Sequence, residues 1–152
     1  MSYQRRKFVF TPPIREIREA DGGQLFQNEF QDANTDVLSA LLPMNVGNRY
    51  VIVYELNKKI LGFLTFLDRG DHLHLDLVEA NQLHTESRIV RPGTALIFFV
   101  EGLSNTLGFD KITLHSTQEN IDLYSTLGYH RNGEDFEDLN YGTLTPMEKL
   151  LS

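Results

Sequence analysis

Basic side chains and a glycine stand together at the start of a strongly apolar segment. The stretch Arg88-Ile89-Val90-Arg91-Pro92-Gly93-Thr94-Ala95 leads into a run that is predicted to form a buried helix. The first turn of a helix carries unpaired backbone N–H groups and a partial positive charge, which together favour phosphate binding. Pro92 suits that turn because its missing N–H is not needed there, and Gly93 has no Cβ to hold a ligand away from the backbone. The pattern predicts a pyrophosphate-binding site.

A second group of polar side chains lies on one predicted strand, residues 72–78. There His72, His74 and Asp76 alternate with leucines, so one face of the strand is expected to be polar and the other apolar. Two histidines on one face supply two metal ligands, but the sequence offers no evident third ligand. We therefore predict no metal site and expect a hydrated or hydrogen-bonded pair.

Several other kinds of chemistry are excluded by what the sequence lacks. The chain has no cysteine, which rules out disulfides, thiolate metal sites and a cysteine nucleophile. It has no glycine-lysine phosphate loop of the nucleotide-hydrolase type. Ser87 lacks the Gly-x-Ser-x-Gly setting of a hydrolase nucleophile.

Charge and composition narrow the class of partner. The formal net charge of −7 makes nucleic-acid binding unlikely and suits a cationic substrate such as an amine, although the same charge would also serve solubility alone. The longest apolar run is six residues, far below the ~20 that a membrane span needs. Arg5-Arg6-Lys7 is followed by too few apolar residues for a secretory signal. We expect one domain over residues 1–152, in the cytoplasm and away from membranes.

The elements that must position these residues follow from hydrophobic periodicity. Strands are predicted at 8–10, 50–56, 60–67, 72–78 and 111–115, and around 129–131 and 142–149, with a hairpin turn at Asn57-Lys58-Lys59. Residues 14–42 read as broken helix, with a further helical segment capped by Asn34 or Thr35. A long helix should follow Pro92 and end near Gly108, and a short one should cover 120–127. Residues 79–91 read as a loop.

This order predicts an α/β fold. Most neighbouring strands should pair antiparallel in one mixed central sheet, with helices on both faces. The strand–helix–strand unit from His72 to His115 should cross over in parallel.

Three motifs in the second half of the chain resemble one known family. Arg88, Arg91 and Gly93 fall on a phosphate-binding signature in which the middle position is usually glycine. Leu123-Tyr124-Ser125-Thr126-Leu127-Gly128-Tyr129 is similar to a pattern of Leu-Tyr, three residues and Gly-Phe. Pro146-Met147-Glu148-Lys149-Leu150 is similar to a closing Met-x-Lys-x-Leu strand. Over residues 48–150 the chain thus resembles the GNAT N-acetyltransferase superfamily, whose members bind acetyl-CoA.

The resemblance implies a direct attack of a primary amine on the thioester of acetyl-CoA, used as a cosubstrate without a metal. The residues that it implies for binding acetyl-CoA are Leu77, Val78, Arg88, Val90, Arg91, Gly93, Thr94, Ala95 and Asn120. Backbone N–H groups near Leu77 and Val78 would polarise the carbonyl. Thr117 stands where relatives often have an asparagine.

The resemblance also implies roles in proton transfer. Tyr124 would donate a proton to the departing thiolate. Glu79 would take the ammonium proton through water, with Asp76 and His74 as alternatives. The acceptor is expected to be a small-molecule or peptide amine; a protein terminus or charged tRNA is a weaker reading, and homodimers are common among relatives. The competing class is a non-catalytic acyl-CoA-binding or protein-interaction module on the same fold.

Overall fold

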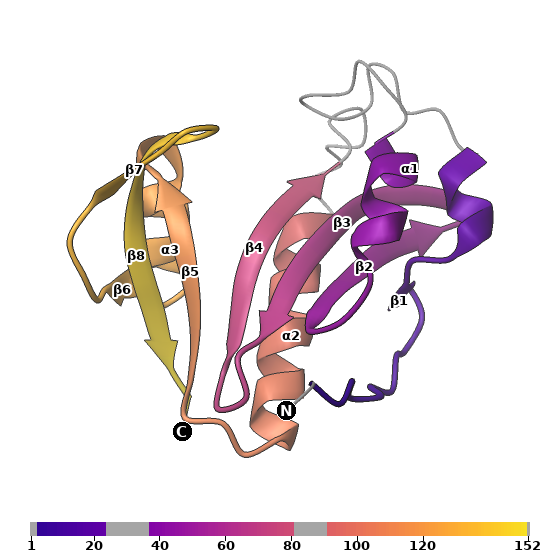
Figure 1. Ribbon diagram of the computed structural model, residues 1–152, viewed down its shortest axis with the longest axis horizontal. Coiled ribbons are helices and arrows are strands. Elements are labelled where there is room, and N and C mark those ends of the chain that lie inside the picture. The colour runs from indigo at the N-terminus through magenta and orange to yellow at the C-terminus, as the bar shows by residue number, and fades with distance from the viewer. Residues whose placement is uncertain (1–2, 24–36, 81–90, 152) are drawn as a thin grey trace.

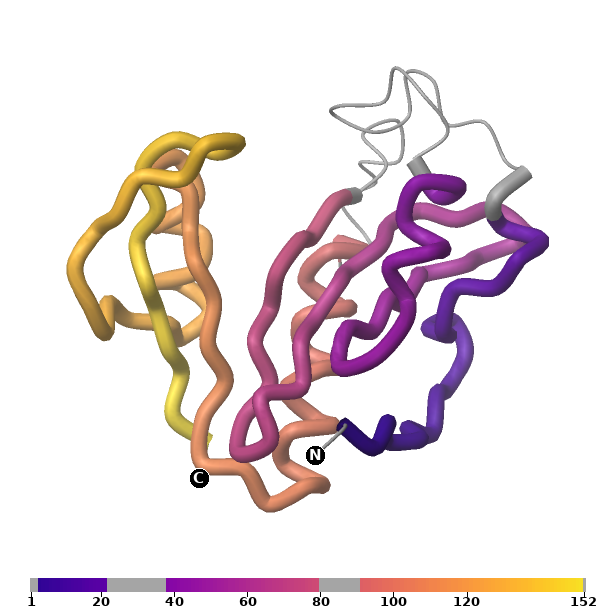
Figure 2. Tube along the Cα trace, in the orientation of Figure 1, coloured from indigo at the N-terminus to yellow at the C-terminus, as the bar shows by residue number. Residues whose placement is uncertain are grey.

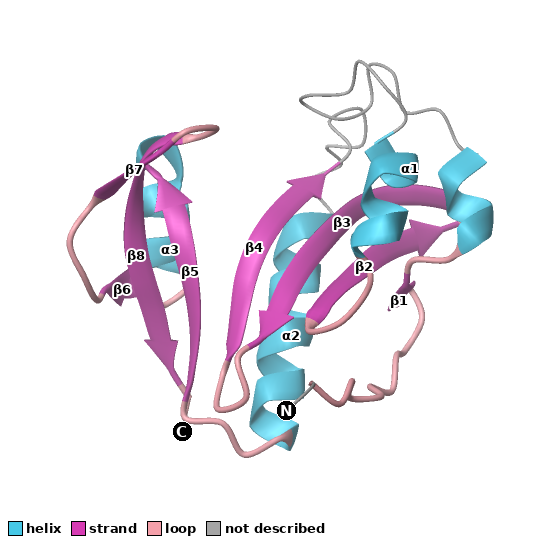
Figure 3. Cartoon of the chain, in the orientation of Figure 1, coloured by secondary structure: helices cyan, strands magenta, loops and turns pink. Residues whose placement is uncertain are grey.

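The computed structural model describes residues 3–23, 37–80 and 91–151, and it shows one eight-stranded sheet with helices on both faces (Figures 1 and 3). The strands are β1 (Ile14–Glu16), β2 (Arg49–Leu56), β3 (Lys59–Asp68), β4 (Leu73–Ala80), β5 (Lys111–Thr117), β6 (His130–Arg131), β7 (Phe136–Asp138) and β8 (Gly142–Leu150). Their order across the sheet is β1-β2-β3-β4-β5-β8-β6, and β7 pairs with β8. Only the β4–β5 pair is parallel among these pairs. The predicted mixed, mostly antiparallel α/β fold is confirmed.

Helices cover the two faces of the sheet in separate clusters. The helices are α1 (Val37–Leu41), α2 (Pro92–Thr106) and α3 (Ile121–Thr126), joined by the 3-10 turns η1 (Glu19–Gly23), η2 (Leu42–Met44) and η3 (Gln118–Asn120). The larger cluster packs α2 and α3 against one face; its members include Leu73, Leu75, Leu96, Val100, Ile112, Leu114 and Met147. The smaller cluster packs α1 against the other face, with Leu38, Leu41, Val51, Val53, Ile60 and Phe63. Among the helices of the described ranges, none has the length and apolarity needed to cross a bilayer.

The first third of the chain departs from the sequence prediction. Residues 8–10 form no strand; instead the Phe8 ring packs on Tyr50 with 5.0 Å between ring centroids. Ile14 starts strand β1, which pairs antiparallel with β2, where a helix was predicted. The reason is visible in the packing, because Ile14 joins the α2 cluster and Ile17 the α1 cluster. Side chains that point to opposite faces of a sheet fit a strand period and not a helix period.

Other boundaries also moved. Pro43 lies beyond the end of α1, in the 3-10 turn η2, and β4 continues to Ala80, two residues into the predicted loop. The short strand β7 was not predicted; it pairs with β8 at Phe136↔Leu144. The candidate caps Asn34 and Thr35 lie outside the described residues. The hairpin is confirmed, with a two-residue turn at Asn57 and Lys58 before β3 begins.

The β4–α2–β5 unit crosses over in parallel as predicted. Helix α2 ends at Thr106, two residues before Gly108, which has φ +76°, a left-handed conformation that glycine adopts easily. The amides of Leu107, Gly108 and Phe109 donate to carbonyls in the last turn of α2. The chain then turns sharply into β5.

A buried polar network ties α2 to the last strand. The Glu101 side chain of α2 is almost fully buried and accepts hydrogen bonds from Tyr129 Oη at 2.8 Å and Lys149 Nζ at 2.9 Å. Burial and the neighbouring carboxylate raise the pKa of Tyr129, so its hydroxyl stays a donor. The buried carboxylate thus has two donors, the phenol of Tyr129 and the ammonium of the partly exposed Lys149.

We expect Glu101→Ala to lower the free energy of unfolding by about 3 kcal/mol, because it leaves the Lys149 ammonium and the Tyr129 hydroxyl without their acceptor. Chemical denaturation of the wild type and the variant measures this change. Glu119→Ala, at an exposed glutamate of η3, is the matched control and should change stability by less than about 0.5 kcal/mol. A similarly small effect at Glu101 would show that the network contributes nothing to stability.

Candidate active site

Strands β4 and β5 pair at one end only. The parallel ladder has three residue pairs and ends at Leu75↔Leu114, although β4 runs on to Ala80 and β5 to Thr117. Figures 1 and 2 show the two strands close together near the C-terminus of the chain and separating toward their carboxyl ends. Beyond the last pair, the facing edges of β4 and β5 form no further ladder pairs with one another, and no other strand of the described residues lies between them.

A β-bulge in β4 lies next to this divergence. Thr65 of β3 pairs with Leu77 and Phe66 with Leu75, so Asp76 is the extra residue. The Leu77 amide faces β3, where it donates to Thr65 Oγ1 at 3.1 Å. Successive residues of a strand point their amides to opposite edges. The Val78 N–H therefore faces the diverging side, toward β5.

The first turn of α2 lies against the same part of β4. A Cβ built on Gly93 would stand 3.4 Å from Val78 Cγ1, so the glycine allows helix and strand to approach closely. Pro92 occupies the first turn, and the N-cap residue Arg91 makes no side-chain hydrogen bond to the helix start. The Ala95 amide donates to the Arg91 carbonyl at 2.9 Å, whereas the amides of Gly93 and Thr94 have no backbone acceptor among the described residues.

Arg91 is exposed and immediately precedes α2 with φ −53° and ψ 135°. Any residue adopts this conformation, so an arginine in a position where the resembled family has glycine causes no backbone strain. Arg88 and Val90 lie outside the described residues.

The far side of the divergence carries the predicted tyrosine. Tyr124 on α3 packs against the α2 cluster, and its ring meets that of Tyr129 edge-on with 6.0 Å between centroids. Burial raises the pKa of Tyr124, which keeps the phenol protonated. Asn120, at the end of η3, is exposed and its side chain makes no cap to α3. Thr117 Oγ1, at the end of β5, is buried without a hydrogen-bond partner among the described residues.

His74, on the face predicted to be polar, is hydrogen-bonded, which is one of the two environments expected for it, but it is not exposed to solvent. This side chain is buried, and its Nδ1 shares a hydrogen bond of 2.7 Å with Thr113 Oγ1 on β5. The His74 ring also meets the exposed His115 ring edge-on at 4.5 Å between centroids. Burial, then the neighbouring His115 and Arg69, lower the pKa of His74 to about 4, so it is neutral at pH 7. The hydrogen bond from His74 to Thr113 joins two strands that are far apart in the sequence. The alternation of polar and apolar residues along β4 alone could not predict it.

The two other candidate bases lie on the same strand. Asp76, in the bulge, forms an ion pair with Arg49 of β2. Glu79 is half-buried and pairs with Phe63 in the β3–β4 ladder. His72, at the turn before β4, shares a hydrogen bond of 2.7 Å between its Nδ1 and Oδ1 of the neighbouring Asp71. Within residues 3–23, 37–80 and 91–151, no three His, Asp or Glu side chains are grouped as a metal site would need.

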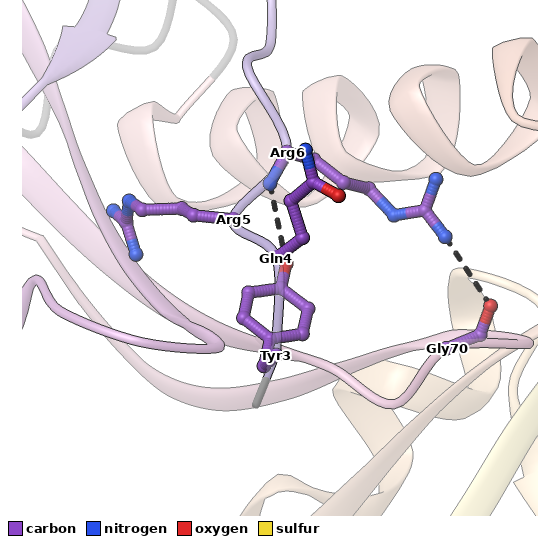
Figure 4. A pocket seen from close by; sticks show the side chains of 5 residues that line it. All are labelled: Tyr3, Gln4, Arg5, Arg6 and Gly70. Atoms are coloured by element: carbon purple, nitrogen blue, oxygen red, sulfur yellow. Dashed lines mark hydrogen bonds between the residues drawn. The ribbon is translucent and has the colours of Figure 1, made fainter. Parts of the chain in front are cut away.

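A pocket of about 460 Å³ lies at the other end of β4, lined by Tyr3, Gln4, Arg5, Arg6 and Gly70 (Figure 4). Its cationic side chains already have carboxylate partners. Arg5 pairs with Glu16 at 2.9 Å, and Arg6 pairs with the buried Asp68 at 2.7 Å. Because these charges are neutralised locally, the pocket is a poor site for an anion, and the diverging strands remain the candidate active site.

Comparison with known proteins decides the family. The chain matches the family model described as an acetyltransferase (GNAT) domain over residues 23–151, which is most of its length. The chain belongs to the GNAT acetyltransferases. The resemblance inferred from the motifs is therefore confirmed, and the protein is an acyltransferase. No curated protein sequence matches the chain.

Solved structures share the fold of this GNAT acetyltransferase. Ard1 from Thermoplasma volcanium matches with a TM-score of 0.68 and 15% identity, over 91% of this chain and 97% of its own. An aminoglycoside 6'-N-acetyltransferase complexed with coenzyme A matches with a TM-score of 0.65 and 15% identity, over 90% of this chain and 96% of its own. The PaiA N-acetyltransferase from Thermoplasma acidophilum, in complex with coenzyme A, matches with a TM-score of 0.54 and 15% identity. The match covers 76% of this chain and 70% of its own.

The environment of His74 predicts a titration that nuclear magnetic resonance can measure. We expect the His74 imidazole to titrate with a midpoint of about 4, well below its usual value of 6.5. Between these values the unfolded chain binds a proton that the folded chain does not, so stability should fall as the pH is lowered from 6.5 toward 4. His74→Gln should remove this part of the pH dependence, and His72→Gln, beside Asp71, should retain it. A His74 midpoint near 6.5 would contradict the buried, neutral assignment.

Proposed function

We propose that this GNAT acetyltransferase moves an acetyl group from acetyl-CoA to a primary amine by direct attack, with no covalent enzyme intermediate. The observation that carries the proposal is the divergence of β4 from β5 beside the uncapped start of α2. The edge of β4 beyond its last pair with β5 suits a chain of amides such as pantetheine, and the helix start suits a pyrophosphate. Coenzyme A in two neighbours with this fold supports the choice of cosubstrate.

The residues around the divergence fit a bound acetyl-CoA. The Gly93 and Thr94 amides supply donors for phosphate oxygens, and the exposed Arg91 adds a nearby positive charge. The buried Thr117 hydroxyl lacks a partner within the described chain, as expected where a ligand supplies one. Leu77 on β4, Ala95 in the first turns of α2 and Asn120 at the end of η3 belong to the proposed site by their places in the chain. Arg88 and Val90 belong to the proposed site on sequence grounds.

The Val78 N–H is the proposed donor to the thioester carbonyl. It faces the side on which β4 has left β5, whereas the Leu77 amide is engaged with Thr65. As the amine nitrogen bonds to the carbonyl carbon, negative charge builds on the carbonyl oxygen. A fixed donor aimed at that oxygen lowers the energy of the transition state.

Tyr124 is the proposed acid. When the C–S bond breaks, the thiolate of coenzyme A takes up a proton, and a phenol with a raised pKa is protonated and ready to supply it. Tyr129, its neighbour, cannot take this role because its hydroxyl is held by Glu101.

Glu79 is the proposed base, which receives the proton that the ammonium group loses, through water. Its position favours it, because Glu79 lies near the carboxyl end of β4, beyond the last residue pair with β5. Of the alternatives, His74 is too weakly basic at neutral pH, because burial lowers its pKa to about 4. The proposed acceptor is a small-molecule or peptide amine, which the net charge of −7 would attract as a cation. Three structural neighbours are named as aminoglycoside 6'-acetyltransferases, which supports a small amine as the acceptor.

Thermal unfolding with and without acetyl-CoA tests the proposal. At a concentration about a hundred times the dissociation constant, binding to the folded state alone adds about 2.7 kcal/mol of stability. Thiol release across a panel of primary amines then separates an enzyme from an acyl-CoA-binding module on the same fold. No stabilisation at saturating acetyl-CoA would overturn the proposal.

Tyr124→Phe should slow turnover by roughly a hundredfold and leave the acetyl-CoA-induced stabilisation intact, because only the proton donor is removed. Tyr129→Phe is the matched control, since it removes a neighbouring phenol hydroxyl that is bonded to Glu101. It should lower stability and keep turnover near the wild-type rate. Loss of acetyl-CoA binding in Tyr124→Phe, or unchanged turnover, would contradict the acid role.

A further inference from the structure

We propose that Thr65 is a positioning residue, whose hydroxyl fixes the β4 bulge and thereby aims the Val78 N–H at the thioester carbonyl. This inference rests on the proposed function. It concerns a residue of β3 that carries none of the chemistry itself.

The environment of Thr65 indicates a specific role. Thr65 is a polar residue inside the apolar stretch of β3; its neighbours Leu64 and Phe66 are fully buried, and it is fully buried itself. A buried hydroxyl in such a strand is costly unless it is hydrogen-bonded. Its Oγ1 accepts the Leu77 amide at 3.1 Å, at the residue that follows the bulge.

The same hydroxyl reaches the extra residue of the bulge. Thr65 Oγ1 donates to Asp76 Oδ2 at 3.5 Å, and that carboxylate oxygen also pairs with Arg49 on β2. The Arg49–Asp76–Thr65 chain therefore links three adjacent strands across the sheet and ends on the Leu77 amide. This explains why Asp76, a candidate base by sequence, is held by a cation instead.

The hydrogen bond between Leu77 and Thr65 fixes which amides of β4 face β3 and which face β5. With the Leu77 N–H held toward β3, the next amide, that of Val78, must face the diverging side. If the hydroxyl is lost, Leu77 loses that acceptor and the bulge can shift its register or its twist. The helix start that is proposed to hold the pyrophosphate, at Gly93 and Thr94, lies on another element and is not directly altered.

The test compares the affinities of acetyl-CoA and coenzyme A by calorimetry, because only acetyl-CoA has the carbonyl. Thr65→Val keeps the shape and removes the hydroxyl. It should weaken acetyl-CoA binding by roughly three- to tenfold, the worth of about one hydrogen bond, and leave coenzyme A binding unchanged. Thr65→Ser restores a hydroxyl and should bind both nearly as the wild type does. Ser104→Ala removes another fully buried hydroxyl, bonded to Val100 of its own helix, and should change neither affinity.

The outcomes separate this inference from the proposed function. If the wild type binds neither nucleotide, the proposed function itself fails. If the wild type binds both and Thr65→Val weakens both equally or neither, Thr65 has only a structural role and the inference is overturned. Should Thr65→Val fail to fold, Asp76→Asn must show the selective loss of acetyl-CoA affinity, and its absence there would overturn the inference as well.

Discussion

The short parallel ladder between β4 and β5 is the constraint on which the rest of the structure depends. Each of these strands has a full-length partner on its outer side, with seven residue pairs from β4 to β3 and seven from β5 to β8, but the two share only three pairs. The sheet thus consists of two halves that meet at one end and part at the other. Strand edges need hydrogen-bond partners, so the parted end is where an extended, amide-rich ligand can complete the sheet.

Helix α2 makes this arrangement stable. It is the connection from β4 to β5, and it packs on β2, β3, β4 and β5, so it covers the line where the halves part. Its carboxyl half is bound to the second half of the sheet through Glu101, Lys149 and Tyr129. Its amino end lies beside Val78, and within the described part of the chain the first-turn amides of Gly93 and Thr94 have no backbone acceptor. The helix therefore braces the two halves at one end and leaves donors for an anion at the other.

The sequence predicted most helices, strands and turns, which depend on residues close together in the chain. It did not predict the contacts between residues of different strands. The hairpin of β2 and β3, the strand at 72–78, the long helix after Pro92 and the closing strand follow from hydrophobic period and turn residues. Ile14 and Ile17 were wrongly predicted to lie in a helix. Residues three apart share one face of a helix, but in a strand they point to opposite faces, as these two do. The bulge at Asp76 requires Thr65 and Arg49 from other strands, and the burial of His74 requires Thr113 and His115. The sequence did hold one sign of the bulge, because a threonine inside an apolar strand, Thr65, needs a hydrogen-bond partner on a neighbouring strand.

Backbone amide resonances during a titration with acetyl-CoA test the central claim most directly. The account predicts that the amides of Val78, Gly93 and Thr94 move together, from the strand that has parted from β5 and from the start of α2. Shifts confined to Tyr3, Arg5, Arg6 and Gly70, around the pocket at the opposite end of β4, would contradict it.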